Sequence, residues 1–293
     1  MSNGSASLTT REFLGEAVRT AAAEVEETAA AALADEPDGV HQHRVRVRRL
    51  RSVLAGFRDR LDRETADGMR ARFAEWGGEL GAVRDMEVRA DVAEQELADA
   101  GIDDPDMVRR LVAGDRQAHA RAHARLVALA ATPEAAERRK ALTALAAASV
   151  TADPDEKAAP FIAAVLAAQA RRVRKAAGRI DGSEESYHAV RKSARRLRYV
   201  AEAVARSAPG LYETQVEELA GVGEALHDAL GGHRDAVLFA DHVAQERVLA
   251  ARAGEWIEAY PAIEASARAA AAERLAALPH ALQRLRRAAS DLR

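Results

Sequence analysis

Two short segments of this chain each combine one histidine with a spaced set of arginines. The first reads HQHRVRVRRLR over residues 41–51, and the second reads HAVRKSARRLR over residues 188–198. Six of the eleven aligned positions are identical: one histidine, four arginines and one leucine. Guanidinium groups present a planar fork of donors that matches phosphate oxygens, and they stay charged at any working pH. The two segments therefore predict a site for a phosphate-rich anion.

The spacing within each segment indicates an amphipathic helix whose charged stripe faces away from its apolar side. At about 100° per residue, the histidine and three of the arginines fall on one side of the helix. These stripe residues are His41, Arg44, Arg48 and Arg51 in the first segment, and His188, Arg191, Arg195 and Arg198 in the second. Lys192 lies at the edge of the second stripe, whereas Arg49 and Arg196 lie off the stripes and are expected to have a supporting role at most. A row of arginines with a contact at every turn suits a linear anion.

A second motif repeats in the same order. LGAVRD at residues 80–85 recurs as LGGHRD at residues 230–235, so each half of the chain is one copy of a unit of about 145 residues. A single basic run is usually a solvated surface face, but such a face would keep its charge and not its residue order. The second motif adds Arg84 and Arg234 as candidates for the anion site. The basic segment 171–179 adds Arg174 and Lys175 as candidate wall residues.

The elements that position these residues are expected to be helices. Aromatic residues make up only 4% of the 293 residues, and no stretch alternates with period two for long. Prolines and capping residues mark helix starts at Thr9, Asp104-Pro105, Thr132-Pro133 and Asp153-Pro154. The predicted helices cover residues 9–34, 39–61, 64–100, 105–131, 134–148, 156–180, 184–206 and 210–249, with one or two more between 255 and 292. We expect an all-α fold of two four-helix bundles related by pseudo-twofold symmetry, with repeats at 1–150 and 151–293.

Composition narrows the classes of partner. Lys and Arg total 43 against 46 Asp and Glu, so positive charge is local and a selective patch is expected. The chain has no cysteine, and no apolar run reaches the length of a membrane span, so we expect a cytoplasmic protein without membrane contact.

Asp115, His119 and His123 share a helix face, but arginines crowd them and no third histidine or cysteine ligand is evident. We therefore expect no metal site and no cofactor.

With both duplicated motifs, the chain resembles the CHAD family of histidine-bearing α-helical domains, from about Leu8 to the C-terminus. The resemblance implies two four-helix bundles, a basic central channel, and binding of inorganic polyphosphate at polyphosphate granules. It implicates the eight stripe residues, with Lys192 as an addition. Many family members carry a fused CYTH triphosphatase-type domain, for which this chain leaves no room, so a standalone domain is expected.

The first functional hypothesis is a non-catalytic module that binds inorganic polyphosphate. The second is a metal-dependent phosphoanhydride hydrolase, which would need carboxylate-held metal ions that the motif helices do not offer. The third is a nucleic-acid-binding helical module, for which only Tyr187 and Tyr199 lie near as stacking residues. The sequence favours binding over catalysis, and polyphosphate over nucleic acid.

Overall fold

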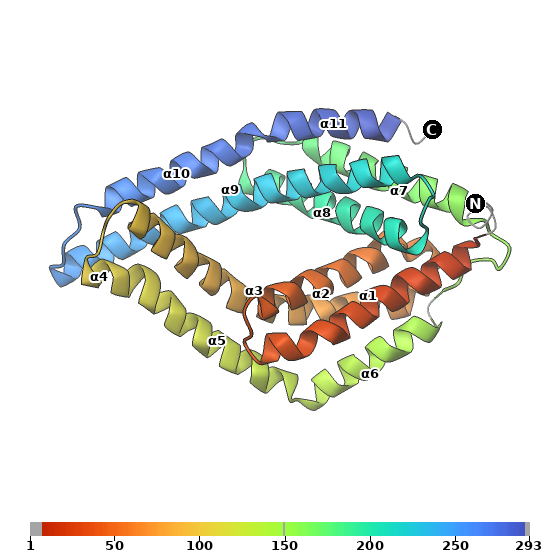
Figure 1. Cartoon of the computed structure of the whole chain (residues 1–293), viewed down its shortest axis with the longest axis horizontal. Coiled ribbons are helices and arrows are strands. Elements are labelled where there is room, and N and C mark those ends of the chain that lie inside the picture. The colour runs from red at the N-terminus through yellow and green to blue at the C-terminus, as the bar shows by residue number, and fades with distance from the viewer. Residues whose placement is uncertain (1–7, 149, 291–293) are drawn as a thin grey trace. The chain divides into compact units, whose positions relative to one another are not determined.

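The computed structural model describes residues 8–148 and 150–290, and it is built from helices (Figure 1). In chain order the helices are α1 (Thr10–Leu33), α2 (Gly39–Gly56), α3 (Arg63–Asp99), α4 (Pro105–Val108), α5 (Gly114–Ala130), α6 (Pro133–Ala148), α7 (Ala158–Ala177), α8 (Glu184–Ser207), α9 (Glu213–Ala253), α10 (Tyr260–Ala276) and α11 (Leu278–Ser290). A 3-10 turn follows α2 at Arg58–Arg60, and a π-helical turn at Arg109–Ala113 joins α4 to α5. The described residues contain no strand, only the isolated bridges Thr9 to Lys157 and Leu61 to Val150. The prediction of an all-α fold is confirmed.

Most of the predicted helix starts have the expected caps. The Thr9 side chain accepts a hydrogen bond from the Glu12 backbone, and the Glu12 carboxylate accepts one from the Thr9 backbone, which completes a capping box. Asp104 accepts from the Met107 backbone ahead of a proline in the first turn. The Thr132 hydroxyl accepts from the Ala135 backbone in the same way.

Two predicted boundaries were wrong. Asp153 does not cap a helix: its carboxylate accepts from the Asp155 backbone 2.9 Å away in a local turn, and α7 begins only at Ala158. The helix predicted to reach residue 61 ends at Gly56. A β-carbon at Gly56 would lie 2.3 Å from Val200 Cγ2, so α2 meets a neighbouring helix closely just where it stops.

The described chain forms two compact units that do not follow the boundary between the sequence repeats. Unit 1 comprises residues 1–77, 130–228 and 279–293, and unit 2 comprises residues 78–129 and 229–278. Both repeats, 1–150 and 151–293, thus contribute to both units. The pseudo-twofold relation between the repeats stays a prediction.

Unit 1 contains both motif helices. Within it, α1 packs on α2, α7 packs on α8, and α2 packs on α8. The apolar core includes Phe13 and Phe57, whose rings meet edge to face with centroids 5.3 Å apart. The half-buried ring of Phe161 packs beside them, with its centroid 6.1 Å from that of Phe57. Because the core joins α1, α7 and the end of α2, the charged stripes of α2 and α8 are held on a packed frame.

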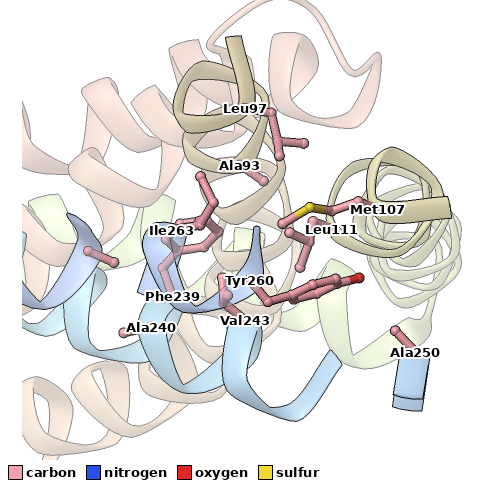
Figure 2. Packing of buried hydrophobic residues seen from close by; sticks show 11 residues of the cluster. Ala93, Leu97, Met107, Leu111, Phe239, Ala240, Val243, Ala250, Tyr260 and Ile263 are labelled. Carbon is pink, nitrogen blue, oxygen red and sulfur yellow. The ribbon is translucent and has the colours of Figure 1, made fainter. Parts of the chain in front are cut away.

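Unit 2 has its own hydrophobic core, drawn in Figure 2. Met107 and Leu111 pack there with Phe239, Tyr260 and Ile263, all of them at most 2% exposed. The cluster gathers side chains from the far part of α3, from α4 and the π-helical turn, and from α9 and α10. A separate core of this kind is what allows residues 78–129 and 229–278 to form a unit of their own.

Gly223 of α9 is a position where unit 1 has no room for a larger side chain. A β-carbon there would lie 2.8 Å from the Arg198 backbone nitrogen and 2.9 Å from the Ala194 carbonyl oxygen, neither of which can move away cheaply. We expect Gly223→Ala to lower the free energy of unfolding by about 1–3 kcal/mol, as overpacking does.

Gly68 of α3 is the matched control, because a β-carbon there meets nothing within 4 Å. Gly68→Ala should be neutral or stabilising by up to about 1 kcal/mol, since alanine favours the helix. Urea denaturation of both variants checks the pair. Equal stability of the two would contradict the close packing of α9 on α8.

Candidate anion-binding site

The structure brings the two charged stripes together within unit 1. Helices α2 and α8 pack on each other, and the missing side chain of Gly56 lets Val200 approach. Arg44, Arg48 and Arg51 come from α2, and Arg191 and Arg195 come from α8; these five residues are called the arginine cluster below. The structure thus places the two helices that carry the charged stripes side by side, and the anion-binding role of these residues stays a prediction.

The electrostatics show how closely the cluster is gathered. Burial lowers the pKa of Arg48, and the charges of Arg44 and Arg191 lower it further. Burial lowers the pKa of Arg195 to about 10, with contributions from Arg48, Arg191 and Arg51. Like charges lower one another's pKa where they share a poorly solvated region, so these shifts agree with the packing of α2 on α8. At neutral pH Arg195 still carries its charge.

Three members of the cluster lack an internal counter-charge. Within residues 8–148 and 150–290, no acidic side chain forms an ion pair with Arg48, Arg51 or Arg195. The Nε atoms of Arg48 and Arg51 are buried and find no hydrogen-bond acceptor among those residues. Buried charges in proteins are normally paired, so this arrangement points to an anion that the protein receives from outside.

His227 of α9 lines the cluster and was not predicted to belong to it. Its Nδ1 accepts a hydrogen bond from Arg191 Nε at 3.3 Å. Burial lowers the pKa of His227 to about 2, helped by Arg191 and Arg195, so the ring is neutral and able to accept. Irregular histidine spacing along α9 concealed this role, because the contact depends on how α9 crosses α8. His227 positions Arg191.

Arg49 shows what a purely structural arginine looks like at the same helix. It is 6% exposed, and its guanidinium donates to Glu24 of α1 at 2.8 Å and to Glu202 of α8 at 2.6 Å. Burial acts to lower its pKa, but the two carboxylates outweigh burial and raise it. The predicted supporting role of Arg49 agrees with this geometry, since the ion pairs link α1, α2 and α8.

Arg198, the sixth arginine of the stripes, differs from the other five. Its guanidinium donates to Glu202 and lies 2.7 Å from both Glu202 and Glu224, and these carboxylates raise its pKa against the effect of burial. Its carbon Cζ lies 5.8 Å from the ring centre of Tyr199, a buried neighbour. Arg198 is thus held at the margin of the cluster with its charge already matched.

The remaining predicted residues of unit 1 lie on its helix surfaces. His41 is half-buried in the first turn of α2, and His188 is exposed near the start of α8. Lys192 is exposed one residue after Arg191. Arg174 and Lys175 are exposed in the last turn of α7, where positive charge also suits the helix dipole. Their part in binding stays a prediction.

Arg84 and Arg234 belong to unit 2, on α3 and α9. Arg84 pairs with Glu87 one turn later at 2.9 Å. Both arginines are half-buried. Their addition to the anion site also stays a prediction.

Asp115, His119 and His123, the residues considered for a metal site, make other contacts in the structure. Asp115 is engaged by Arg89, which donates to its two carboxylate oxygens at 2.6 Å each. His119 and His123 stack with ring centroids 6.2 Å apart, and His119 Nδ1 lies 3.3 Å from the Val83 carbonyl oxygen. The described residues contain no group of three or more potential metal ligands.

As to membranes, none of the described helices has the length and apolarity needed to cross one.

Comparison with curated proteins gives two relatives, both described as uncharacterized and both from Mycobacterium tuberculosis. They are MT2285 of strain CDC 1551 / Oshkosh and Rv2226 of strain ATCC 25618 / H37Rv, each 30% identical over 236 residues. The matched region covers 76% of this chain and 43% of each relative. This chain therefore spans less than half the length of these relatives.

Comparison with solved structures gives two similar folds. PptA from Streptomyces chartreusis has a TM-score of 0.66 at 20% identity, covering 97% of this chain and 99% of that one. The CHAD domain from the plant Ricinus communis has a TM-score of 0.67 at 22% identity, covering 98% of this chain and 94% of that one. At such identities the likeness shows a shared fold.

The family comparison agrees with the duplicated motifs and with the fold. The family model of the CHAD domain matches residues 14–244, which include both arginine-rich segments and both LGxxRD motifs. On this match, this chain belongs to the CHAD domain family.

Proposed function

We propose that this chain binds inorganic polyphosphate through the arginine cluster and does not cleave it. The observation that carries the proposal is the set of three half-buried arginines, Arg48, Arg51 and Arg195, without an acidic partner among the described residues. They come from two packed helices, so the backbone positions that carry them are fixed before a ligand arrives. Membership of the CHAD domain family supports the same ligand.

A linear polyanion suits this arrangement better than a single compact anion. The cluster follows two helices, with arginines three or four residues apart, so contacts recur at about 5–6 Å along each helix. Each contact is a charge-assisted hydrogen bond, and each neutralised phosphate releases a counterion. Affinity should therefore be high and should fall steeply with salt.

The carboxylates beside the cluster support binding over hydrolysis. Phosphoanhydride cleavage generally uses carboxylate-held metal ions to offset the developing charge. Glu202 and Glu224 are the acidic side chains that the structure places beside Arg198, and both are engaged by its guanidinium. A metal ion at this place would have to displace arginine contacts already made. In the cell we expect the protein in the cytoplasm, at polyphosphate granules.

The proposal is tested by titration of long-chain polyphosphate, tripolyphosphate and single-stranded DNA into the purified protein at low and moderate salt. Orthophosphate release is measured in the same samples with and without magnesium. We expect tight, salt-sensitive binding of polyphosphate, weaker binding of DNA, and no release. Equal affinity for DNA would overturn the selectivity, and magnesium-dependent release would overturn the non-catalytic role.

A further inference from the structure

Arg51 and Arg198 occupy the same position in the two motif copies, but their ionic partners differ. In the described part of the chain, Arg51 forms no ion pair with an acidic side chain. The Arg198 guanidinium lies 2.7 Å from Glu202 and 2.7 Å from Glu224. By the offsets of the repeated motifs, the positions of these two acids correspond in the first repeat to Ala55 and Ala74. The pair of carboxylates is therefore a property of the second repeat.

The two acids hold Arg198 to different degrees. Glu202 lies one turn after Arg198 on α8, its side chain is 18% exposed, and it also accepts a hydrogen bond from Arg49. Glu224 comes from α9, its side chain is 51% exposed, and it contacts the outer nitrogen Nη2 of Arg198. An ion pair with a half-exposed carboxylate is broken at little cost, whereas two arginines fix Glu202. Glu224 is thus the partner that a ligand can displace.

The packing of α9 on α8 places Glu224 beside the arginine cluster. A β-carbon on Gly223 would lie 2.8 Å from the Arg198 backbone nitrogen, so the two helices touch at this point. One turn further along α9, His227 accepts a hydrogen bond from Arg191 of the cluster at 3.3 Å. Glu224 lies between these two contacts and three residues before His227, hence on the same side of α9. Its carboxylate therefore borders the row of arginines that α8 contributes.

The carboxylate on Arg198 has the chemistry that a phosphate would use there. Both anions accept charge-assisted hydrogen bonds from the planar fork of a guanidinium. While Glu224 engages Nη2 of Arg198, a phosphate can use that nitrogen only by taking the place of the carboxylate. Part of the energy of binding is then spent on breaking the ion pair.

We propose that Glu224 is a competitor that the protein carries itself: its carboxylate binds Arg198, and a polyphosphate chain must displace it to engage this sixth arginine of the stripes. The inference rests on the proposed function and deepens it, because it identifies a residue that limits the affinity of the site. Removal of the competitor is expected to strengthen binding, although no contact with the ligand is added.

The first test removes the competitor and leaves every arginine in place. Glu224→Gln is compared with Glu217→Gln, which removes the same charge from an exposed position two turns earlier on α9. Long-chain polyphosphate should bind Glu224→Gln about 3- to 5-fold more tightly than Glu217→Gln, since the ligand no longer has to break an exposed ion pair. Titrations of both variants at one salt concentration measure the difference.

The second test asks whether Glu224 acts through Arg198. In an Arg198→Gln background, the advantage of Glu224→Gln over Glu217→Gln should vanish, because no guanidinium is left to release. Circular dichroism checks that each variant keeps its helices. An advantage of the same size in both backgrounds would mean that Glu224 repels the ligand directly, and it would overturn competition for Arg198.

The outcomes separate this inference from the proposed function. If neither the unaltered protein nor Glu224→Gln binds polyphosphate, the proposed function fails and the inference fails with it. If the unaltered protein binds, and Glu224→Gln binds no more tightly than Glu217→Gln, the role of Glu224 is wrong while the cluster stands.

Discussion

Replacement of Arg48 and Arg195 with alanine is expected to weaken polyphosphate binding by about 10²- to 10⁴-fold. Each residue is half-buried and has no acidic partner among the described residues, so each guanidinium has its full donor capacity available for phosphate. A hydrogen bond to a charged group contributes about 1.5–3 kcal/mol, and two such contacts account for the expected loss. Extension of the change to Arg44 and Arg191 should remove specific binding while the helices remain.

The measurement is a titration at fixed salt, with circular dichroism as the check on helicity. Arg48→Lys/Arg195→Lys keeps the charge but loses the planar fork, so its affinity should lie between those of the original protein and the alanine variant. The alanine variant should also be no less stable than the original, because it relieves repulsion between like charges. Affinity within threefold of the original would exclude these residues from the site.

Glu202→Gln is expected to cause the largest loss of stability from a single change at the site, about 3 kcal/mol. Glu202 accepts from Arg49 at 2.6 Å and from Arg198 at 2.7 Å, and it holds α2 to α8 through Arg49. Removal of its charge leaves Arg49, which is 6% exposed, with Glu24 alone. A buried ion that loses part of its compensation is strongly destabilising.

Glu224→Gln is the matched control, since Glu224 contacts the same Arg198 but its side chain is 51% exposed. This change should cost less than about 1 kcal/mol, as is usual for a surface pair. Guanidinium denaturation at neutral pH measures both. Equal losses would mean that the buried pairing of Arg49 does not hold the two helices together.

Sequence periodicity predicted the helices well because caps and apolar spacing are local properties. Thr9 with Glu12, and Asp104 ahead of Pro105, mark helix starts that the structure contains. The end of α2 at Gly56 could not be read in this way, because it coincides with the close approach of Val200 from another helix. The division of each repeat between two units depends on long-range packing for the same reason.

The functional site was predicted only in part, for a similar reason. Helical spacing predicted which arginines share a face, and five of the six stripe arginines belong to the arginine cluster. It could not tell which charges have acidic partners: Arg198 is paired with Glu202, whereas Arg48 has no ion pair among the described residues. It also passed over His227, which reaches the site from a different helix. The pattern within one segment cannot predict which side chains neighbouring helices bring to the site.

The arginine cluster takes residues from α2 and α8, one from each copy of the duplicated sequence. A protein with a single copy would carry half of the cluster on one exposed helix face, and Arg49 would lack the carboxylate that α8 supplies. Such an ancestor could have assembled the same site only by pairing with an identical molecule. Gene fusion would then have replaced a concentration-dependent dimer with a permanent one and freed the two halves to diverge. Arg49 and Arg196 show such divergence, since carboxylates raise the pKa of the first while burial lowers that of the second.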